Sequence, residues 1–318
     1  MSVVIVAPGQ GSQTPGFLTP WLEVPRFATH LDELATASGV DLRTHGTTSD
    51  ADTIRDTAVA QPLIVAASLL TLAAVLGDDA DAAAARRGRL AGIAGHSVGE
   101  LAAAAGAGIL TESDAMVLVR ERGRAMAAAA AASAETGMSA VIGADEQELL
   151  AKLAELGLEP ANFNGGGQIV VAGELEGLAA LRAEPPAGAR VIPLQVAGAF
   201  HTRFMAPAVE TLRGVAATLP VADPSLTIWT NRDGSTVASG ADFVELLVGQ
   251  VASPVRWDRT MEAFAAAGVT GLIELAPAGA LAGLAKRGLP GLPTVAVKTP
   301  DDLAAARDLI DNAGASPA

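Results

Sequence analysis

The segment from residue 90 to residue 110 places a serine between a strand-like run and a helix-like run. Residues 90–95, "LAGIAG", are apolar and end in glycine, as expected of a buried strand. The pattern G-x-S-x-G follows around Ser97, and the small residues of "ELAAAAGAGIL" then predict a helix packed closely under a sheet. Such a turn exposes the serine hydroxyl at the carboxyl end of the sheet. The segment predicts an α/β fold with Ser97 as a candidate nucleophile, although a tight packing turn would show the same pattern.

The composition agrees with a buried parallel sheet covered by helices. Half of the 318 residues are apolar and only 3% are aromatic, so aliphatic side chains must build the core. The net charge of −14 argues against a generic nucleic-acid binder, because phosphate neutralisation needs clustered lysine and arginine. The absence of cysteine excludes disulfides, thiolate metal ligands and cysteine nucleophiles.

The amino-terminal run "MSVVIVAPGQ" lacks the basic segment and cleavage site of a secretory signal, so we expect a cytoplasmic protein. Residues 58–77 carry no charge over the length of a membrane span. However, Asp56, Asp78 and Asp79 flank them and no positive cluster sets a topology. We therefore expect a buried helix and no membrane partner.

Residues 138–196 have a pattern of their own. Strand-like and helix-like runs alternate there as β-α-β-β-α-β, the ferredoxin-like order. We expect a small domain at 129–196, inserted into a large domain formed by 1–128 and 197–318. Beyond the insertion, the run "LTIWTNRDG" at 226–234 predicts a strand and a turn.

A serine nucleophile needs a base, which must come from one of four histidines. His30 lies in a helical stretch, His45 lies in a polar loop, and the side chain of His96 should point away from its neighbour Ser97. His201 follows a strand-like run and so falls at a strand's end, where α/β sites assemble. No acid occupies an obvious strand end between Ser97 and His201. A group other than a carboxylate must then orient the imidazole ring of His201.

Arg122 lies on an apolar face of a predicted helix, with Leu118, Val119, Ala125 and Met126 three or four positions away. A guanidinium in that setting is costly unless an anion meets it. A snorkelling side chain and an internal ion pair are the alternatives.

The loop "PGQGSQ" at 8–13 lacks the third glycine of G-x-G-x-x-G and the GK[ST] of a phosphate-binding loop. We therefore expect no nucleotide cofactor there. The loop can instead lend the backbone N–H of Gln10 to an oxyanion hole, together with that of Val98 at the start of a helix.

Taken together, these motifs resemble the malonyl-CoA:acyl carrier protein transacylases of type II fatty acid synthesis, and the acyltransferase domains of polyketide synthases. The motifs occur in the family's order over nearly the whole chain: "APGQGSQ", "AQP", "GHSVGE", "RERG", "ANFNGGGQIVVAG", "GAFHT" and "QVASPVRW". The resemblance implies an α/β-hydrolase-like large domain with an inserted ferredoxin-like small domain and a site between them. It also implies malonyl transfer from coenzyme A to the phosphopantetheine thiol of an acyl carrier protein, through a serine acyl-enzyme, with no metal or cofactor.

The resemblance also assigns catalytic roles to individual residues. Ser97 would be the acylated nucleophile and His201 its base, oriented by the backbone carbonyl of Gln250. The backbone N–H groups of Gln10 and Val98 would form the oxyanion hole.

On the substrate side, the resemblance implies that Arg122 pairs bidentately with the malonyl carboxylate. It places Gln61, in "AQP", among the substrate-binding residues. Phe200, in "GAFHT", would limit the room for an α-methyl group.

The carrier protein of this family is acidic, so docking on an acidic enzyme must use local basic spots. Lys286 and Arg287 are the candidates, with Arg120 and Arg124 as alternatives. A helix end whose cations favour the dipole would show the same residues.

Two other functions remain open at this stage. A serine hydrolase or thioesterase would share Ser97 and His201 but release acyl groups to water, and a carboxylate clamp at Arg122 would argue against it. A non-enzymatic binding module with a vestigial turn is the third reading.

Overall fold

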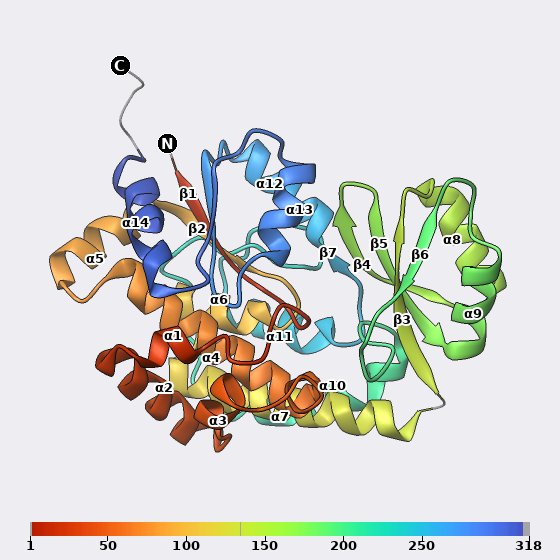
Figure 1. Cartoon of the computed structure of the whole chain (residues 1–318), viewed down its shortest axis with the longest axis horizontal. Helices are drawn as coiled ribbons and strands as arrows, with labels where there is room; N and C mark the ends of the chain where they lie inside the picture. The colour runs from red at the N-terminus through yellow and green to blue at the C-terminus, as the bar shows by residue number, and fades with distance from the viewer. Residues whose placement is uncertain (1, 134, 314–318) are drawn as a thin grey trace.

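Two β-sheets lie side by side, and helices pack against each of them (Figure 1). The computed structural model describes residues 2–133 and 135–313. The first sheet is parallel with the order β2-β1-β8-β9, whose bounds are Leu90–Gly95, Val3–Ala7, Gly271–Glu274 and Thr294–Ala296. The second sheet has the order β6-β3-β5-β4-β7, whose bounds are Arg190–Pro193, Thr136–Ile142, Gln168–Glu174, Glu159–Gly165 and Val255–Arg256.

The central strand β1 shows why the first sheet is covered on both faces. All five of its residues are buried, as in parallel strands that lie between two helical layers. Val3, Ile5 and Ala7 belong to one apolar cluster, whereas Val4 and Val6 belong to another. Alternate side chains of one strand thus supply two separate cores.

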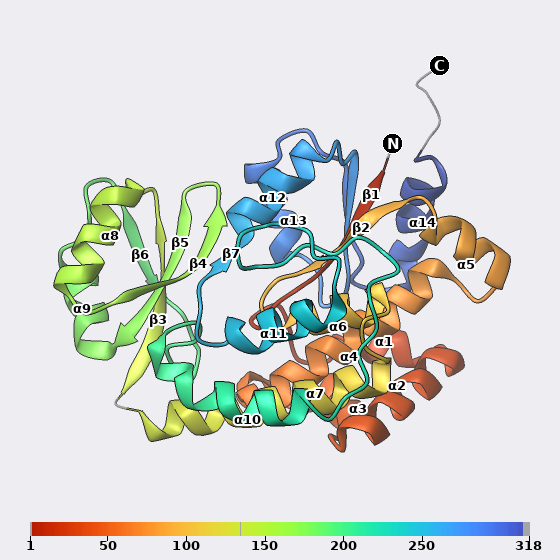
Figure 2. The same ribbon diagram turned by 180° about the vertical axis from the view of Figure 1, so that it is seen from behind.

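The larger cluster contains most of the helices, and Figure 2 shows α10 running along α7 on that side. Its helices are α1 (Thr19–Leu22), α2 (Pro25–Ser38), α3 (Leu42–Thr47), α4 (Thr57–Leu76), α6 (Gly99–Ala107), α7 (Glu112–Ala132), α10 (Ala206–Ala216), α11 (Gly240–Gln250) and α14 (Leu303–Asp311). The smaller cluster contains α12 (Trp257–Ala266) and α13 (Ala280–Gly288). Of the remaining elements, α5 (Ala80–Arg87) follows α4, and the 3-10 turns are η1 (Thr53–Arg55), η2 (Arg203–Met205) and η3 (Pro300–Asp302).

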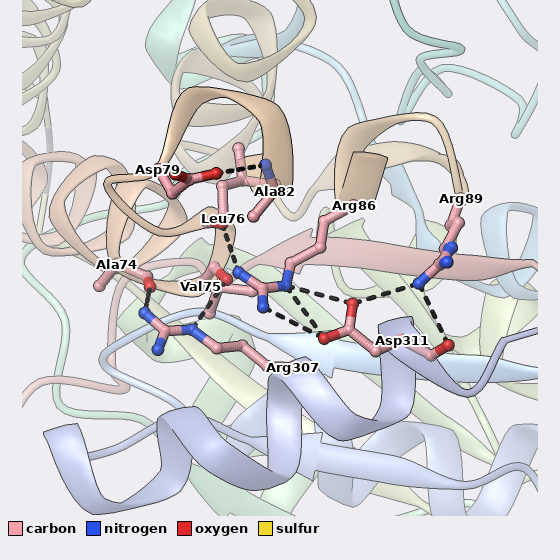
Figure 3. A network of polar contacts seen from close by, with 9 residues as sticks. All are labelled: Ala74, Val75, Leu76, Asp79, Ala82, Arg86, Arg89, Arg307 and Asp311. Carbon is pink, nitrogen blue, oxygen red and sulfur yellow. Dashed lines mark hydrogen bonds and ion pairs between the residues drawn. The ribbon is translucent and has the colours of Figure 1, made fainter. Parts of the chain in front are cut away.

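Helix α4 is long and apolar enough to cross a membrane, but 83% of its most apolar window is buried inside the fold. Two arginines donate hydrogen bonds to the carbonyls at its carboxyl end (Figure 3). Arg307 donates to the carbonyls of Ala74 and Val75, and Arg86 donates to that of Leu76. These bonds satisfy carbonyls that the end of a helix leaves without partners. The expected buried helix is therefore present.

The second sheet follows the predicted β-α-β-β-α-β order. Helix α8 (Glu146–Glu155) connects β3 to β4, and α9 (Leu175–Ala183) connects β5 to β6. Strand β7, from a later part of the chain, adds to β4 in parallel. We propose the boundaries 129–196 for the small domain, with the first of them inside the last turns of α7.

Of the strand and turn predicted at 226–234, the strand is wrong. That segment makes only isolated bridges, Ile228 with Ile93 and Trp229 with Thr236, while the predicted turn follows directly. The physical reason is that the chain reverses at Thr230, whose N–H donates to Ser235 and whose carbonyl accepts from Gly234. A ladder cannot extend through that reversal.

Candidate active site

A cavity of about 710 Å³ opens between the two sheets. The first sheet's side contributes Ser97 and His201, and the second sheet contributes Met138, Asn162 and Val170. The predicted site residues Gln10, Gln61 and Phe200 also line it. The motifs that are scattered along the sequence thus meet at one place.

The turn between β2 and α6 holds Ser97 in a left-handed conformation, with φ 53°. Only glycine fits on either side of it: a Cβ on Gly95 would lie 2.0 Å from the carbonyl carbon of Gly99, and one on Gly99 would lie 2.2 Å from the Ala7 oxygen. The Asn231 side chain accepts from the Ser97 N–H at 2.7 Å and donates to the Gly95 carbonyl at 2.7 Å. The strained turn is therefore fixed by close packing and by one amide.

His201 lies between the serine and a backbone carbonyl. Its Nε2 is 2.7 Å from the Ser97 Oγ, and its Nδ1 is 2.9 Å from the Gln250 carbonyl oxygen. Because a carbonyl only accepts, Nδ1 must carry the proton and Nε2 is free to accept one from the serine. Burial, and then the positive charge of Arg122, lower the pKa of His201 to about 3. The imidazole is therefore a neutral base at neutral pH.

Two backbone N–H groups are candidate donors to an oxyanion at Ser97. Val98 is the N-cap of α6, and Gln10 lies in the loop after β1. Within residues 2–133 and 135–313, no protein group accepts a hydrogen bond from the N–H of either residue. A negative oxygen on an acyl group at Ser97 could accept from the Val98 N–H at the start of α6 and from the Gln10 N–H of the loop after β1.

Arg122 is buried next to the serine, with 1% of its surface exposed, so it does not snorkel. Its Nη1 donates to the Gln61 Oε1 at 2.8 Å, and its Nη2 donates to the Gln250 Oε1 at 2.9 Å and to the Ser97 Oγ at 3.3 Å. Burial lowers its pKa to about 10, so it stays charged at neutral pH. Among the described residues no carboxylate forms an ion pair with it. The groups that Arg122 contacts directly are neutral, so its positive charge is available to bind an anion.

Three polar residues of the site are absent from the set predicted from the sequence. Asn231 holds the serine turn. The Asn164 Oδ1 accepts from His96 Nε2 at 3.0 Å, so the His96 side chain points away from Ser97 as expected. Glu100 has 1% of its surface exposed, accepts from the Asn231 N–H at 2.6 Å and contacts the Gln250 side chain. Burial raises the pKa of Glu100 to about 8. Glu100 lies in the motif "GHSVGE" and Asn164 in the motif "ANFNGGGQIVVAG", so their place in a motif was the sequence feature that could have pointed to them.

The basic residues considered for docking differ in their surroundings. Lys286 and Arg287 are exposed at the end of α13, and Arg287 lies at the edge of the cavity. Among the described residues neither forms an ion pair. Arg120 and Arg124 both lie within 4 Å of the Glu121 carboxylate, at 2.7 Å and 3.6 Å. The α13 pair therefore has more free positive charge next to the cavity.

The sequence matches one family model and is similar to proteins that share one name. Residues 4–299 match the model of the family described as "Acyl transferase domain". The chain is 50% identical over 305 residues to the malonyl CoA-acyl carrier protein transacylase of Mycobacterium tuberculosis strain H37Rv, covering 95% of this chain and 98% of that one. It is 33% identical to the Escherichia coli K12 protein of the same name, covering 96% and 98%.

Solved structures agree with the sequence relatives. The crystal structure of MCAT from Mycobacterium tuberculosis superposes with a TM-score of 0.90 at 47% identity, covering 96% of this chain and 100% of that one. A malonyl-transacylase in complex with its type II PKS acyl-carrier protein superposes with a TM-score of 0.86 at 30% identity, covering 97% and 100%. The fold is therefore the large α/β domain with a small ferredoxin-like subdomain that these structures share.

Proposed function

The chain belongs to the acyl transferase domain family, and from that premise we propose that it transfers a malonyl group from coenzyme A to the phosphopantetheine thiol of an acyl carrier protein. The observation that carries the proposal is the position of Arg122, whose Nη2 lies 3.3 Å from the Ser97 Oγ. A cation next to a nucleophile selects an acyl group that carries its own negative charge.

The first half-reaction follows from the hydrogen bonds of His201. Its Nε2 takes the proton of the Ser97 hydroxyl while Oγ attacks the thioester carbonyl carbon. The N–H groups of Gln10 and Val98 stabilise the oxyanion that forms. When the C–S bond breaks, Nε2 returns the proton to the sulfur and coenzyme A leaves as a thiol, with the malonyl ester on Ser97.

The second half-reaction uses the same groups in reverse order. His201 takes the proton from the phosphopantetheine thiol as its sulfur attacks the ester carbonyl. The proton then goes to the Ser97 Oγ as the ester bond breaks. The Gln250 carbonyl keeps the Nδ1 proton in place throughout and stabilises the transient imidazolium. One serine thus serves two thiols in a ping-pong mechanism.

Arg122 has the donors that a malonyl carboxylate requires. Each terminal nitrogen carries two hydrogens, and one of each is used by Gln61 or Gln250. The second Nη1 hydrogen, and the second Nη2 hydrogen once it leaves the Ser97 Oγ that it contacts at 3.3 Å, can bind both oxygens of one carboxylate. The carboxylate of a malonyl thioester is two bonds from the carbonyl carbon that Ser97 attacks. Phe200, next to His201 on the cavity wall, would restrict an α-methyl group.

A serine hydrolase is the alternative, and it is less well supported. Hydrolysis requires no cation at the acyl subsite, and the relatives named above are transacylases.

We also propose that the enzyme acts in the cytoplasm. Its acidic partner would bind at Lys286 and Arg287.

The test is the change Arg122→Ala, measured with malonyl-CoA and acetyl-CoA in separate assays. Loss of a charge-assisted pair of roughly 1.5–3 kcal/mol should lower kcat/KM for malonyl-CoA by about 10- to 150-fold. Acetyl-CoA has no second carboxylate and should be affected little. Arg43→Ala, which removes a surface arginine paired with Asp32, is the matched control. Equal losses for both donors would make Arg122 a structural residue.

A further inference from the structure

Glu100 is a buried acid next to the site that the mechanism above leaves unused. It lies in the first turn of α6, three residues after the nucleophile, and 1% of its surface is exposed. We propose that Glu100 is a positioning residue: through the side chain of Gln250 it orients Arg122 for the substrate carboxylate. This inference rests on the function proposed above.

The hydrogen-bond chemistry fixes the direction of this relay. Arginine only donates, so the Gln250 amide must turn its Oε1 toward Arg122, at 2.9 Å from Nη2. The Nε2 of the same amide then faces Glu100 Oε2 and donates to it. The amide orientation that suits Arg122 therefore points a donor at Glu100. The same Nε2 lies farther from two other acceptors, 3.2 Å from the Asn231 Oδ1 and 3.3 Å from the Ser97 carbonyl oxygen.

The other oxygen of Glu100 is also an acceptor. The backbone N–H of Asn231 donates to Oε1 at 2.6 Å. With a donor on each oxygen, the geometry suits the ionised carboxylate, which is acceptor-only. When Glu100 is ionised, Arg122 and Glu100 form a buried pair of opposite charges, and one neutral amide separates them.

Arg122 is the charged residue that acts on Glu100. Arg122 on α7 favours the carboxylate, while burial opposes it and raises the pKa of Glu100 to about 8. The two histidines of the site, His96 after β2 and His201 before η2, both have a pKa lowered by burial and stay neutral. The carboxylate therefore titrates within the pH range of an ordinary assay.

Glu100 is connected to Arg122 and to His201 through different parts of Gln250. Gln250 contacts Arg122 through its side chain, but it contacts His201 through its backbone carbonyl. Loss of the Glu100 carboxylate should turn the amide and leave the carbonyl in place. The predicted effect is therefore specific to the acyl group that uses Arg122.

The experiment is Glu100→Gln, assayed for acylation by malonyl-CoA and by acetyl-CoA. The new amide can accept from Asn231 only by presenting its NH2 to the NH2 of Gln250. Gln250 must then turn and present a donor to Arg122. We expect kcat/KM for malonyl-CoA to fall on the order of tenfold, the effect of one hydrogen bond to a charged group, with acetyl-CoA little changed. Equal losses for both donors would overturn the proposal.

Glu274→Gln is the matched control, because Glu274 is another fully buried acid, one that binds the N–H groups at the start of α13. It should lower the melting temperature without changing the malonyl-to-acetyl ratio. A change in the ratio equal to that of Glu100→Gln would show that any lost buried acid has this effect, and would overturn the proposal.

A second measurement needs no variant and remains decisive if Glu100→Gln does not fold. Protonation of Glu100 would place a donor against the Gln250 amide. The malonyl-to-acetyl ratio of kcat/KM in the wild type should therefore rise with pH through about 8. A ratio that stays flat from about pH 4.5, near the ordinary pKa of a glutamate, to about pH 9.5 would overturn the proposal. A wild-type protein that transfers no malonyl group at all would instead overturn the proposed function.

Discussion

His201 is a strong candidate for the base because its two ring nitrogens have unlike partners. The Gln250 carbonyl holds the proton on Nδ1 at 2.9 Å, and the Ser97 hydroxyl lies against Nε2 at 2.7 Å. A backbone carbonyl replaces the carboxylate of a hydrolase triad, so no further negative charge is buried behind the imidazole. The histidine remains neutral next to Arg122, as the mechanism requires.

This arrangement predicts a change in pH dependence. Burial comes first among the causes that lower the pKa of His201 to about 3, and the Arg122 cation is second. Arg122→Ala removes a charge that opposes protonation, so the pKa of His201 should rise. The base works only when neutral, so activity should then be lost at a higher pH on acidification. The measurement is kcat/KM for acetyl-CoA against pH, in the wild type and in the variant. An acid limb that stays in place would contradict the account.

The candidate nucleophile, base and arginine could be predicted from residue types and local patterns. Of the residues that hold them, Gln250 was implied by the family resemblance, whereas Asn231 and Glu100 were not, because their partners are distant in the chain. Asn231 contacts Ser97 across 134 positions, and Glu100 contacts Gln250 across 150. No periodicity or motif connects such pairs. Their roles became visible only when the fold brought them together.

At the scale of elements, α6 and α13 place the site. Helix α6 approaches β1 so closely that a Cβ on Gly99 would strike the Ala7 carbonyl, and this contact brings the helix start to Ser97. Helix α13 is fixed by Glu274, which accepts from three N–H groups at its start. Its basic end is then held next to the cavity.

That position predicts the docking behaviour of the carrier protein. Reversing both charges, Lys286→Glu with Arg287→Glu, should raise the KM for the carrier protein and leave acylation by malonyl-CoA unchanged. The wild-type KM should itself rise with salt, since exposed charges are screened within about 10 Å at 0.1 M. Steady-state kinetics at low and high salt check both effects. If the KM of the double variant for the carrier protein is unchanged at low salt, these residues only end a helix and do not bind the carrier protein.

Most helices and strands were predictable because their patterns are local. The exceptions depend on tertiary structure. The segment 226–234 was predicted as a strand and a turn, and the reversal at Thr230 limits the strand part to bridges. Strand β7 has two residues and exists only because β4 lies next to it. Local propensity carries too little information for either case.

At the scale of the whole molecule, the site lies in the cavity between the two sheets. Ser97 and His201 come from the large domain's side of that cavity, while Met138 and Val170 come from the ferredoxin-like sheet. Both thiols must reach the same serine through this one space, which favours sequential use of the site over simultaneous binding. Ping-pong chemistry is the kinetic consequence.

The most direct test is intact-protein mass spectrometry of the wild type and of Ser97→Ala. After mixing with malonyl-CoA, the wild type should gain one malonyl group, and should lose it when the phosphopantetheine-bearing carrier protein is added. Ser97→Ala should gain none and transfer none. A variant that still transfers malonyl groups at the wild-type rate, or a wild type that never forms the adduct, would contradict the account.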